Sequence, residues 1–82
     1  MHYVYFAKSQ QDNSVYVGLT ENVKARIRQH NLGKTKSLKS KLPVILIYFE
    51  AYFDKTIARK REIRLKKSWK TKEEILIRLG NK

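Results

Sequence analysis

At residues 2–19 the chain reads HYVYFAKSQQDNSVYVGL. Residues 2–8 alternate between two faces and are rich in aromatic and β-branched side chains, as strands are. Residues 9–14 are a polar turn cluster, after which residues 15–19 return to the strand pattern. The stretch predicts an N-terminal β-hairpin whose loop is longer than a two-residue turn.

The middle of the chain predicts a helix, a loop and a strand. A helix over 21–32 would follow Thr20, a suitable N-cap, and end at Gly33, a residue type common just past helix ends. The basic stretch 34–42 predicts a mobile loop. Residues 44–51 are too continuously apolar for a half-exposed strand, so we expect a strand buried, at least in part, on both faces.

The last third of the chain predicts two helices. Asp54 or Thr56 can cap a helix over residues 56–68. The Thr-Lys-Glu-Glu sequence of residues 71–74 matches a capping box and predicts a short helix over 72–79 that ends at the following glycine. The order ββαβαα predicts an α+β fold in which helices flank a three-stranded antiparallel sheet.

Composition narrows the class of protein. Its 82 residues, 41% of them hydrophobic, support a single small domain over residues 1–82. The absence of cysteine excludes disulfides and zinc sites built on thiolates. No apolar run approaches the roughly 18 residues of a membrane span. The N-terminus also lacks the pattern of a signal peptide, so we expect a cytoplasmic protein without a membrane partner.

Positive charge is concentrated in two segments. The chain carries 19 Lys and Arg against 7 Asp and Glu, a net charge of +12. Residues 21–41 hold seven basic residues and one acidic residue, and residues 55–72 hold nine basic residues and one acidic residue. A polyanion is therefore the expected partner, and nucleic acid is the first candidate. For either segment alone, a solvated helix face is the alternative.

One acidic residue interrupts the second basic segment. Glu62 lies at helical spacing from Ala58 and Leu65, within the apolar stripe of the expected helix. Trp69 continues this stripe. A carboxylate on the apolar side needs a cationic partner or a metal. The alternative that periodicity favours is an ion pair with Lys66, four residues later.

Two further groups of residues could carry chemistry. Tyr5 and Tyr16 can meet across the hairpin, on the same face as Gly18, and glycine within a strand often marks the close approach of a backbone or ligand. Plain aromatic packing is the alternative. Arg26 and His30 lie four residues apart on one flank of the first helix, where Arg can hold a phosphate and His can hold or move a proton. Simple surface exposure is the alternative for this pair.

These residues together resemble a known nuclease family. Two tripeptides separated by ten residues resemble the paired motifs of the GIY-YIG family, namely Tyr3-Val4-Tyr5 and Tyr16-Val17-Gly18. Arg26, His30 and Glu62 fall where that family carries an arginine, in many members a histidine, and a glutamate. The resemblance covers essentially the whole chain and is closest to the small stand-alone bacterial members. Asn81 is a poor counterpart for the polar residue that larger members carry near the end of the domain.

The resemblance implies a metal-dependent phosphodiesterase that cuts DNA by in-line attack of water. Glu62 would bind one Mg²⁺ or Mn²⁺, Arg26 would hold the scissile phosphate, and His30 would assist. Tyr5 or Tyr16 would orient the water and act as the base or relay to it, with nearby cations lowering its pKa. The sequence leaves open which tyrosine serves, and we favour Tyr5.

The implied partner is DNA, with RNA left open. Basic side chains of both segments would hold the backbone without reading bases, namely Lys34, Lys36, Lys39, Lys41, Lys60, Arg64, Lys66 and Lys67. We expect a monomer with no protein partner and with low sequence specificity, or with a preference for a nick, flap or branch. The alternatives are a non-catalytic nucleic-acid-binding domain on the same fold and, more distantly, a basic RNA- or ribosome-associated protein.

Overall fold

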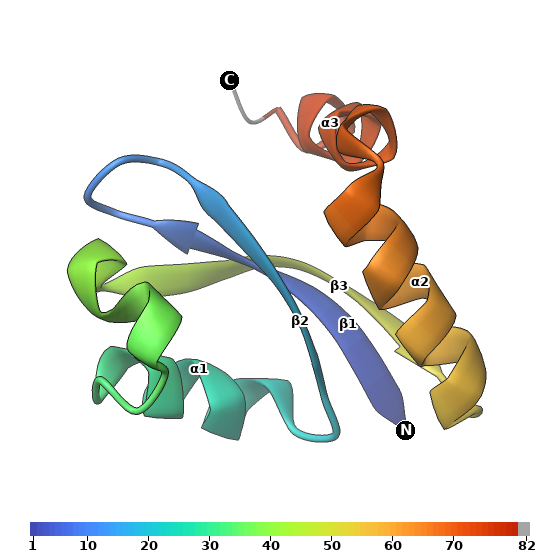
Figure 1. Ribbon diagram of the computed structural model, residues 1–82, viewed down its shortest axis with the longest axis horizontal. Helices are drawn as coiled ribbons and strands as arrows, with labels where there is room; N and C mark the ends of the chain where they lie inside the picture. Colours follow the sequence, from blue (N-terminus) through green and yellow to red (C-terminus); the bar gives the residue numbers. More distant parts are fainter. Residues whose placement is uncertain (81–82) are drawn as a thin grey trace.

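The computed structural model describes residues 1–80, which fold into three strands, three α-helices and one 3-10 helix (Figure 1). In chain order these are β1 (His2–Ser9), β2 (Val15–Thr20), α1 (Val23–Asn31), η1 (Lys36–Lys41), β3 (Val44–Tyr52), α2 (Lys55–Lys67) and α3 (Trp69–Arg78). Asn81 lies outside the described residues. Within residues 1–80, no helix combines the length and the apolar character that crossing a membrane requires.

The strands form one antiparallel sheet of order β2-β1-β3, with β1 in the centre. In the pairing of β1 with β2, Tyr5 lies opposite Gly18 and Ala7 lies opposite Tyr16. Helices lie on both sides of the sheet (Figure 1). The predicted α+β fold, with its three-stranded antiparallel sheet and its order ββαβαα, is confirmed.

Alternating side chains of β1 supply two hydrophobic clusters, one on each face of the sheet. Val4 and Phe6 are buried in the cluster that contains Leu65 of α2 and Ile75 of α3. The second cluster, on the opposite face, contains Tyr5 together with partly buried side chains of α1. Neighbouring residues of β1 therefore contact α2 and α3 on one face of the sheet and α1 on the other.

The start of α1 differs from the predicted start. Asn22 is its N-cap, and the Asn22 side chain accepts a hydrogen bond of 3.0 Å from the backbone N–H of Ala25. Thr20, the predicted cap, instead accepts a hydrogen bond of 3.2 Å from the backbone N–H of Asn22. At the other end, Gly33 has a φ of +79°, which is the left-handed conformation expected for a glycine that ends a helix.

The prediction of a mobile loop over 34–42 is wrong. Residues Lys36–Lys41 form η1, and Leu38 at its centre is buried. A single apolar side chain anchors this otherwise basic segment, a signal too sparse for a periodicity argument to detect.

Strand 44–51 is buried in part on both faces, as expected, but less than its continuous apolar run suggests. Val44 is buried in the Tyr5 cluster, and Ile47 and Tyr48 are half-buried against the Val4 and Phe6 cluster. Three other apolar side chains are exposed, namely Ile45, Leu46 and Phe49. A three-stranded sheet has one interior strand, and the topology gives that position to β1. A continuous apolar run therefore identified a strand correctly without identifying its place in the sheet.

The boundary between α2 and α3 falls earlier than predicted. Asp54 caps α2, as one of the two predicted candidates. Ser68 ends α2 and caps α3, accepting a hydrogen bond of 3.3 Å from the backbone N–H of Thr71. Because α3 begins at Trp69, the predicted capping box at 71–74 is not its start, and Trp69 leaves the apolar stripe and is exposed.

Candidate active site

Tyr5 and His30 form a buried hydrogen-bonded pair. The Tyr5 hydroxyl lies 2.6 Å from His30 Nε2, and the two residues are 1% and 0% exposed. Tyr5 is in the middle of β1 and His30 is in the last turn of α1, so the pair ties the central strand to the helix. The alternative of a surface-exposed histidine is wrong, because His30 points into the protein.

Gly18 makes room for the Tyr5 side chain. A Cβ atom at position 18 would lie 2.5 Å from Tyr5 Cζ, a distance that real Cβ atoms do not reach. The sequence suggested a close approach at this glycine by a backbone or ligand. In the structure, the tyrosine opposite it on β1 fills the space.

Tyr16 completes an aromatic cluster with this pair. Its ring centroid lies 6.3 Å from that of Tyr5 and 5.4 Å from that of His30, edge-on to the imidazole. Lys66 Nζ of α2 lies 5.9 Å from the centroid of the Tyr16 ring. The two tyrosines therefore meet across the hairpin as expected, with Tyr16 half-buried and closer to solvent.

Thr35 contacts the other nitrogen of His30. The Thr35 hydroxyl lies 2.6 Å from His30 Nδ1, and the residue itself directly precedes η1. Thr35 could not be predicted from the sequence, because the contact depends on the chain reversing at Gly33 and no helical or strand spacing continues through that turn. Both ring nitrogens of the buried imidazole are thus hydrogen-bonded, which fixes the orientation of the ring.

Burial and nearby charge shift the pKa values of this pair in opposite directions. Burial, with a smaller contribution from Tyr16, raises the pKa of Tyr5 to about 12, although a hydrogen bond and the charge of Arg26 act to lower it. Burial and Arg26 both lower the pKa of His30. At neutral pH Tyr5 is therefore protonated and His30 is uncharged. With the ring proton on Nδ1, Tyr5 donates to Nε2 and Nδ1–H donates to the Thr35 hydroxyl; in the other tautomer both directions reverse. The expected lowering of the pKa by cations is outweighed by burial.

Arg26 lies at the edge of the cluster. It is half-buried on α1, and its Nη1 donates a hydrogen bond of 3.1 Å to Gln29 Oε1. Its charge acts on both Tyr5 and His30. The guanidinium therefore lies near the Tyr5 hydroxyl, on the more exposed side of the cluster.

Glu62 is buried on α2 and ion-paired. The residue is 4% exposed, with Arg59 Nη1 at 2.6 Å from Oε1 and Lys66 Nζ at 3.0 Å from Oε2. The ion pair with Lys66 that periodicity favoured is therefore present, joined by a second one from Arg59. The charge of Glu62 also reaches Tyr5, where it acts to raise the pKa. Lys66, which pairs with Glu62, also lies 5.9 Å from the centroid of the Tyr16 ring, so it links the carboxylate to the tyrosine cluster.

Glu62 is chemically suited to a hard divalent cation. Among residues 1–80, no three His, Asp or Glu side chains gather into a complete cage for a metal. Mg²⁺ does not need one, since it is commonly held by one or two carboxylates, substrate phosphates and water. The side chains of Arg59 and Lys66 are 60% and 45% exposed and can swing away from the carboxylate. A single carboxylate freed in this way fits Mg²⁺ or Mn²⁺.

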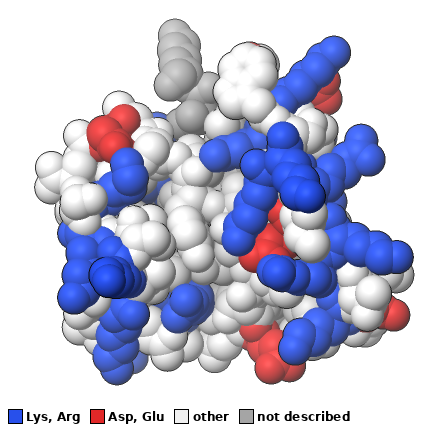
Figure 2. Space-filling model, viewed as in Figure 1, with Lys and Arg blue, Asp and Glu red and all other residues white. Residues whose placement is uncertain are grey.

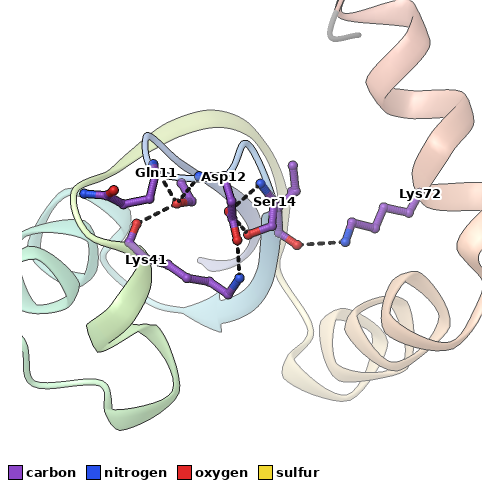
Figure 3. A network of polar contacts seen from close by, with 7 residues as sticks. Gln11, Asp12, Ser14, Lys41 and Lys72 are labelled. Carbon is purple, nitrogen blue, oxygen red and sulfur yellow. Dashed lines mark hydrogen bonds and ion pairs between the residues drawn. The ribbon is translucent and has the colours of Figure 1, made fainter.

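The basic segments reach one face of the molecule together. In Figure 2, Lys and Arg side chains gather over the α1 and η1 side at the left and over the α2 and α3 side at the right, with a largely uncharged band between them. Two of the eight predicted nucleic-acid contacts are in ion pairs: Lys66 with Glu62, and Lys41 with Asp12 at 2.6 Å (Figure 3). Lys41 holds the pKa of the Asp12 carboxyl well below its ordinary value. The other six side chains are exposed, namely Lys34, Lys36, Lys39, Lys60, Arg64 and Lys67.

Several known proteins resemble this chain in sequence. Residues 1–74 match the GIY-YIG catalytic domain. A UPF0213 protein of Staphylococcus haemolyticus is 48% identical over 66 residues, which are 79% of each chain. A UPF0213 protein of Haloquadratum walsbyi is 35% identical over 80 residues, covering 96% of this chain and 89% of the relative.

A solved structure shares the fold. The solution NMR structure of a UPF0213 protein from Bacillus halodurans superimposes with a TM-score of 0.59 at 34% identity, over 95% of this chain and 83% of that one. The tyrosine-bearing hairpin, the helix that carries Arg26 and His30, and the glutamate of α2 all lie within the residues that match the catalytic domain. The chain therefore belongs to the GIY-YIG family.

Proposed function

We propose that this protein is a metal-dependent endonuclease that hydrolyses phosphodiester bonds in DNA. The observation that carries the proposal is the convergence of five side chains from four different elements of the fold. They are Tyr5, Tyr16, Arg26, His30 and Glu62. Separate elements bring together groups that suit phosphate binding, proton transfer and metal binding, which plain core packing would not require.

The Tyr5 and His30 pair supports a proton relay. A tyrosine with a pKa of about 12 is a poor source of phenolate at neutral pH. If Tyr5 passes its own proton to His30 Nε2 while accepting one from the attacking water, no free phenolate has to form. The imidazolium produced in this way keeps its Nδ1–H hydrogen bond to Thr35. Tyr16, which is nearer to solvent, would orient the water.

Arg26 and Glu62 support the phosphate side of the reaction. Arg26 would hold the scissile phosphate and stabilise the charge that develops on it in the transition state. Glu62 would hold Mg²⁺ or Mn²⁺, and when bound the metal would supply stabilisation of the leaving oxygen. Arg59 and Lys66, released from Glu62, would then be free to contact the DNA backbone.

The exposed lysines of η1 and α2 support binding to the DNA backbone. Long cationic side chains on either side of an uncharged band suit two stretches of phosphates and carry no information about base sequence (Figure 2). We therefore propose low sequence specificity or a preference for a branched or nicked structure. RNA in place of DNA in the same binding assays tests the alternative of an RNA partner.

A nicking assay with purified protein tests the proposal. Supercoiled and branched DNA are incubated with Mg²⁺, with Mn²⁺ and with EDTA. The expected result is metal-dependent nicking that Arg26→Ala abolishes while DNA binding is retained. Arg28→Ala is the matched control, because it removes one exposed positive charge from the same helix outside the cluster. Nicking that persists in EDTA or is unchanged in Arg26→Ala would contradict the proposal.

A non-catalytic nucleic-acid-binding domain is the second candidate. The observation that favours it is that each carboxylate oxygen of Glu62 is already ion-paired. It predicts DNA affinity that falls steeply with salt concentration and no cleavage product with any metal.

A further inference from the structure

Trp69 is a large aromatic side chain left in solvent. It is the only tryptophan of the chain and is 72% exposed at the first residue of α3. The break at Ser68 turns it away from the stripe that Ala58 and Leu65 bury. Nothing in the packing of the hydrophobic core accounts for its position.

Trp69 lines a small cavity between α3 and the hairpin. The cavity has a volume of about 170 Å³ and is lined by Asn13, Val15, Trp69, Lys72, Glu73 and Leu76. Its walls combine apolar side chains with an amide, an ammonium and a carboxylate. This combination matches a nucleobase, which has flat apolar faces and an edge of hydrogen-bond donors and acceptors.

A direct hydrogen bond braces the cavity. Lys72 Nζ donates to the backbone carbonyl of Val15 at 2.7 Å, and Figure 3 shows this side chain reaching from α3 toward the hairpin. Burial lowers the pKa of Lys72, which is half-buried in this position. Because the lysine fastens α3 to the start of β2, the cavity is formed before any ligand arrives.

The surroundings of the cavity favour a strand of nucleic acid as the occupant. The segment 55–72 holds nine basic residues and one acidic residue, and Lys67 and Lys70 are exposed close to Trp69 in the chain. The cavity and the candidate active site lie on opposite faces of β2, because Val15 packs with the Val4 and Phe6 cluster and Tyr16 packs with the Tyr5 cluster. Since β2 is an edge strand of the sheet, a nucleic-acid strand can pass around it from one face to the other. Aromatic side chains beside a basic groove are a common platform for single-stranded bases.

We propose that this cavity binds one unpaired nucleobase, stacked on Trp69, on a strand whose backbone continues toward the active site. The inference rests on the proposed nucleic-acid partner and deepens it. A duplex keeps its bases stacked internally, so the site would favour single-stranded segments such as a flap, a loop or the unpaired arm of a branch. The protein would then prefer a DNA structure with unpaired bases over any particular base sequence.

The fluorescence of the single tryptophan tests the proposal directly. A 12-nucleotide single strand and a blunt duplex of the same sequence are titrated in EDTA, so that cleavage plays no part. The single strand is expected to quench Trp69 emission much more than the duplex does. By anisotropy of a labelled oligonucleotide, Trp69→Ala should raise the Kd for the single strand about five- to a hundredfold, and that for the duplex less than twofold. Trp69→Phe should fall between these values.

Phe53→Ala is the matched control, because Phe53 is 91% exposed but does not line the cavity. It should leave both Kd values unchanged. Equal losses on single strand and duplex in Trp69→Ala, with nicking intact, would overturn this inference alone. A shift of Trp69 emission with protein concentration in the absence of DNA would also overturn it, because a second copy would then cover the site. Absence of binding to either DNA would overturn both this inference and the proposed function.

Discussion

His30 Nε2 lies 2.6 Å from the hydroxyl of Tyr5, and both residues are buried. The bond joins the central strand to α1 at the point where the two motif strands pair. It also places a proton donor with a raised pKa against an acceptor with a lowered pKa. The hydrogen bond therefore contributes to the fold and, in the proposed reaction, provides the path for a proton.

Removal of the Tyr5 hydroxyl should affect both stability and activity. Tyr5→Phe leaves His30 Nε2 buried without its partner, which should cost about 1–3 kcal/mol in the free energy of unfolding. Nicking should fall by roughly 100-fold or more, because the relay is lost. Tyr3→Phe is the matched control on the same strand and should change neither. Full activity in Tyr5→Phe would exclude the relay.

Thr35 should fix the tautomer of His30. The proposed relay needs Nε2 free to accept from Tyr5, so ¹⁵N NMR of the wild-type imidazole should show the proton on Nδ1, with the Thr35 hydroxyl as its acceptor. Thr35→Val removes this acceptor and should shift the population toward the other tautomer, whereas Thr35→Ser should restore the wild-type spectrum. An unchanged spectrum in Thr35→Val would show that Tyr5 alone sets the tautomer.

A side chain at position 18 should displace Tyr5. Gly18→Ala introduces a Cβ that overlaps the Tyr5 ring, so we expect a loss of about 1–3 kcal/mol in urea unfolding and a weakened Tyr5–His30 hydrogen bond. The comparison is Gly33→Ala, where φ is +79° but a Cβ meets no atom within 4 Å. That variant should lose stability through backbone strain and keep the NMR signature of the hydrogen bond. Retention of the signature in Gly18→Ala would contradict the steric argument.

Stability should fall as the pH drops below about 6.5, the ordinary pKa of histidine. Folding lowers the pKa of His30, so as the pH falls the unfolded chain binds a proton before the folded protein does. This proton uptake stabilises the unfolded state relative to the folded state. The contribution is complete above pH 6.5 and is lost toward the lower pKa of the folded state. Urea unfolding at pH 7.5 and pH 5 measures the loss. The slope should persist in His2→Gln and disappear in His30→Gln; a slope that persists in His30→Gln would assign it to another group.

The hairpin and its tyrosines could be predicted because strand alternation places residues on a face without knowledge of the rest of the fold. Tyr5, Tyr16 and Gly18 share a face in any antiparallel pairing with this register. Helical spacing likewise placed Glu62 among Ala58 and Leu65, and its burial follows.

Two other features could not be predicted, because residue spacing within one element gives no information about contacts between elements. The hydrogen bond from Thr35 to His30 crosses the turn at Gly33. The exposure of Trp69 depends on which residue caps α3. Ser68 is the cap, three residues before Thr71, where the predicted capping box begins. Both Ser68 and Thr71 are residue types that cap helices, so the local sequence does not decide between them.

Single-turnover nicking by Glu62→Gln tests the central claim most directly, because it removes the one carboxylate proposed to hold the metal and keeps the shape of the side chain. The matched control is Glu74→Gln, which removes an exposed carboxylate on α3. With Mg²⁺ and saturating protein, we predict that Glu62→Gln binds DNA at least as tightly as the wild type and gives no nicked product. Glu74→Gln should cut at the wild-type rate. Equal nicking by Glu62→Gln and the wild type would contradict the assignment of this cluster as a nuclease active site.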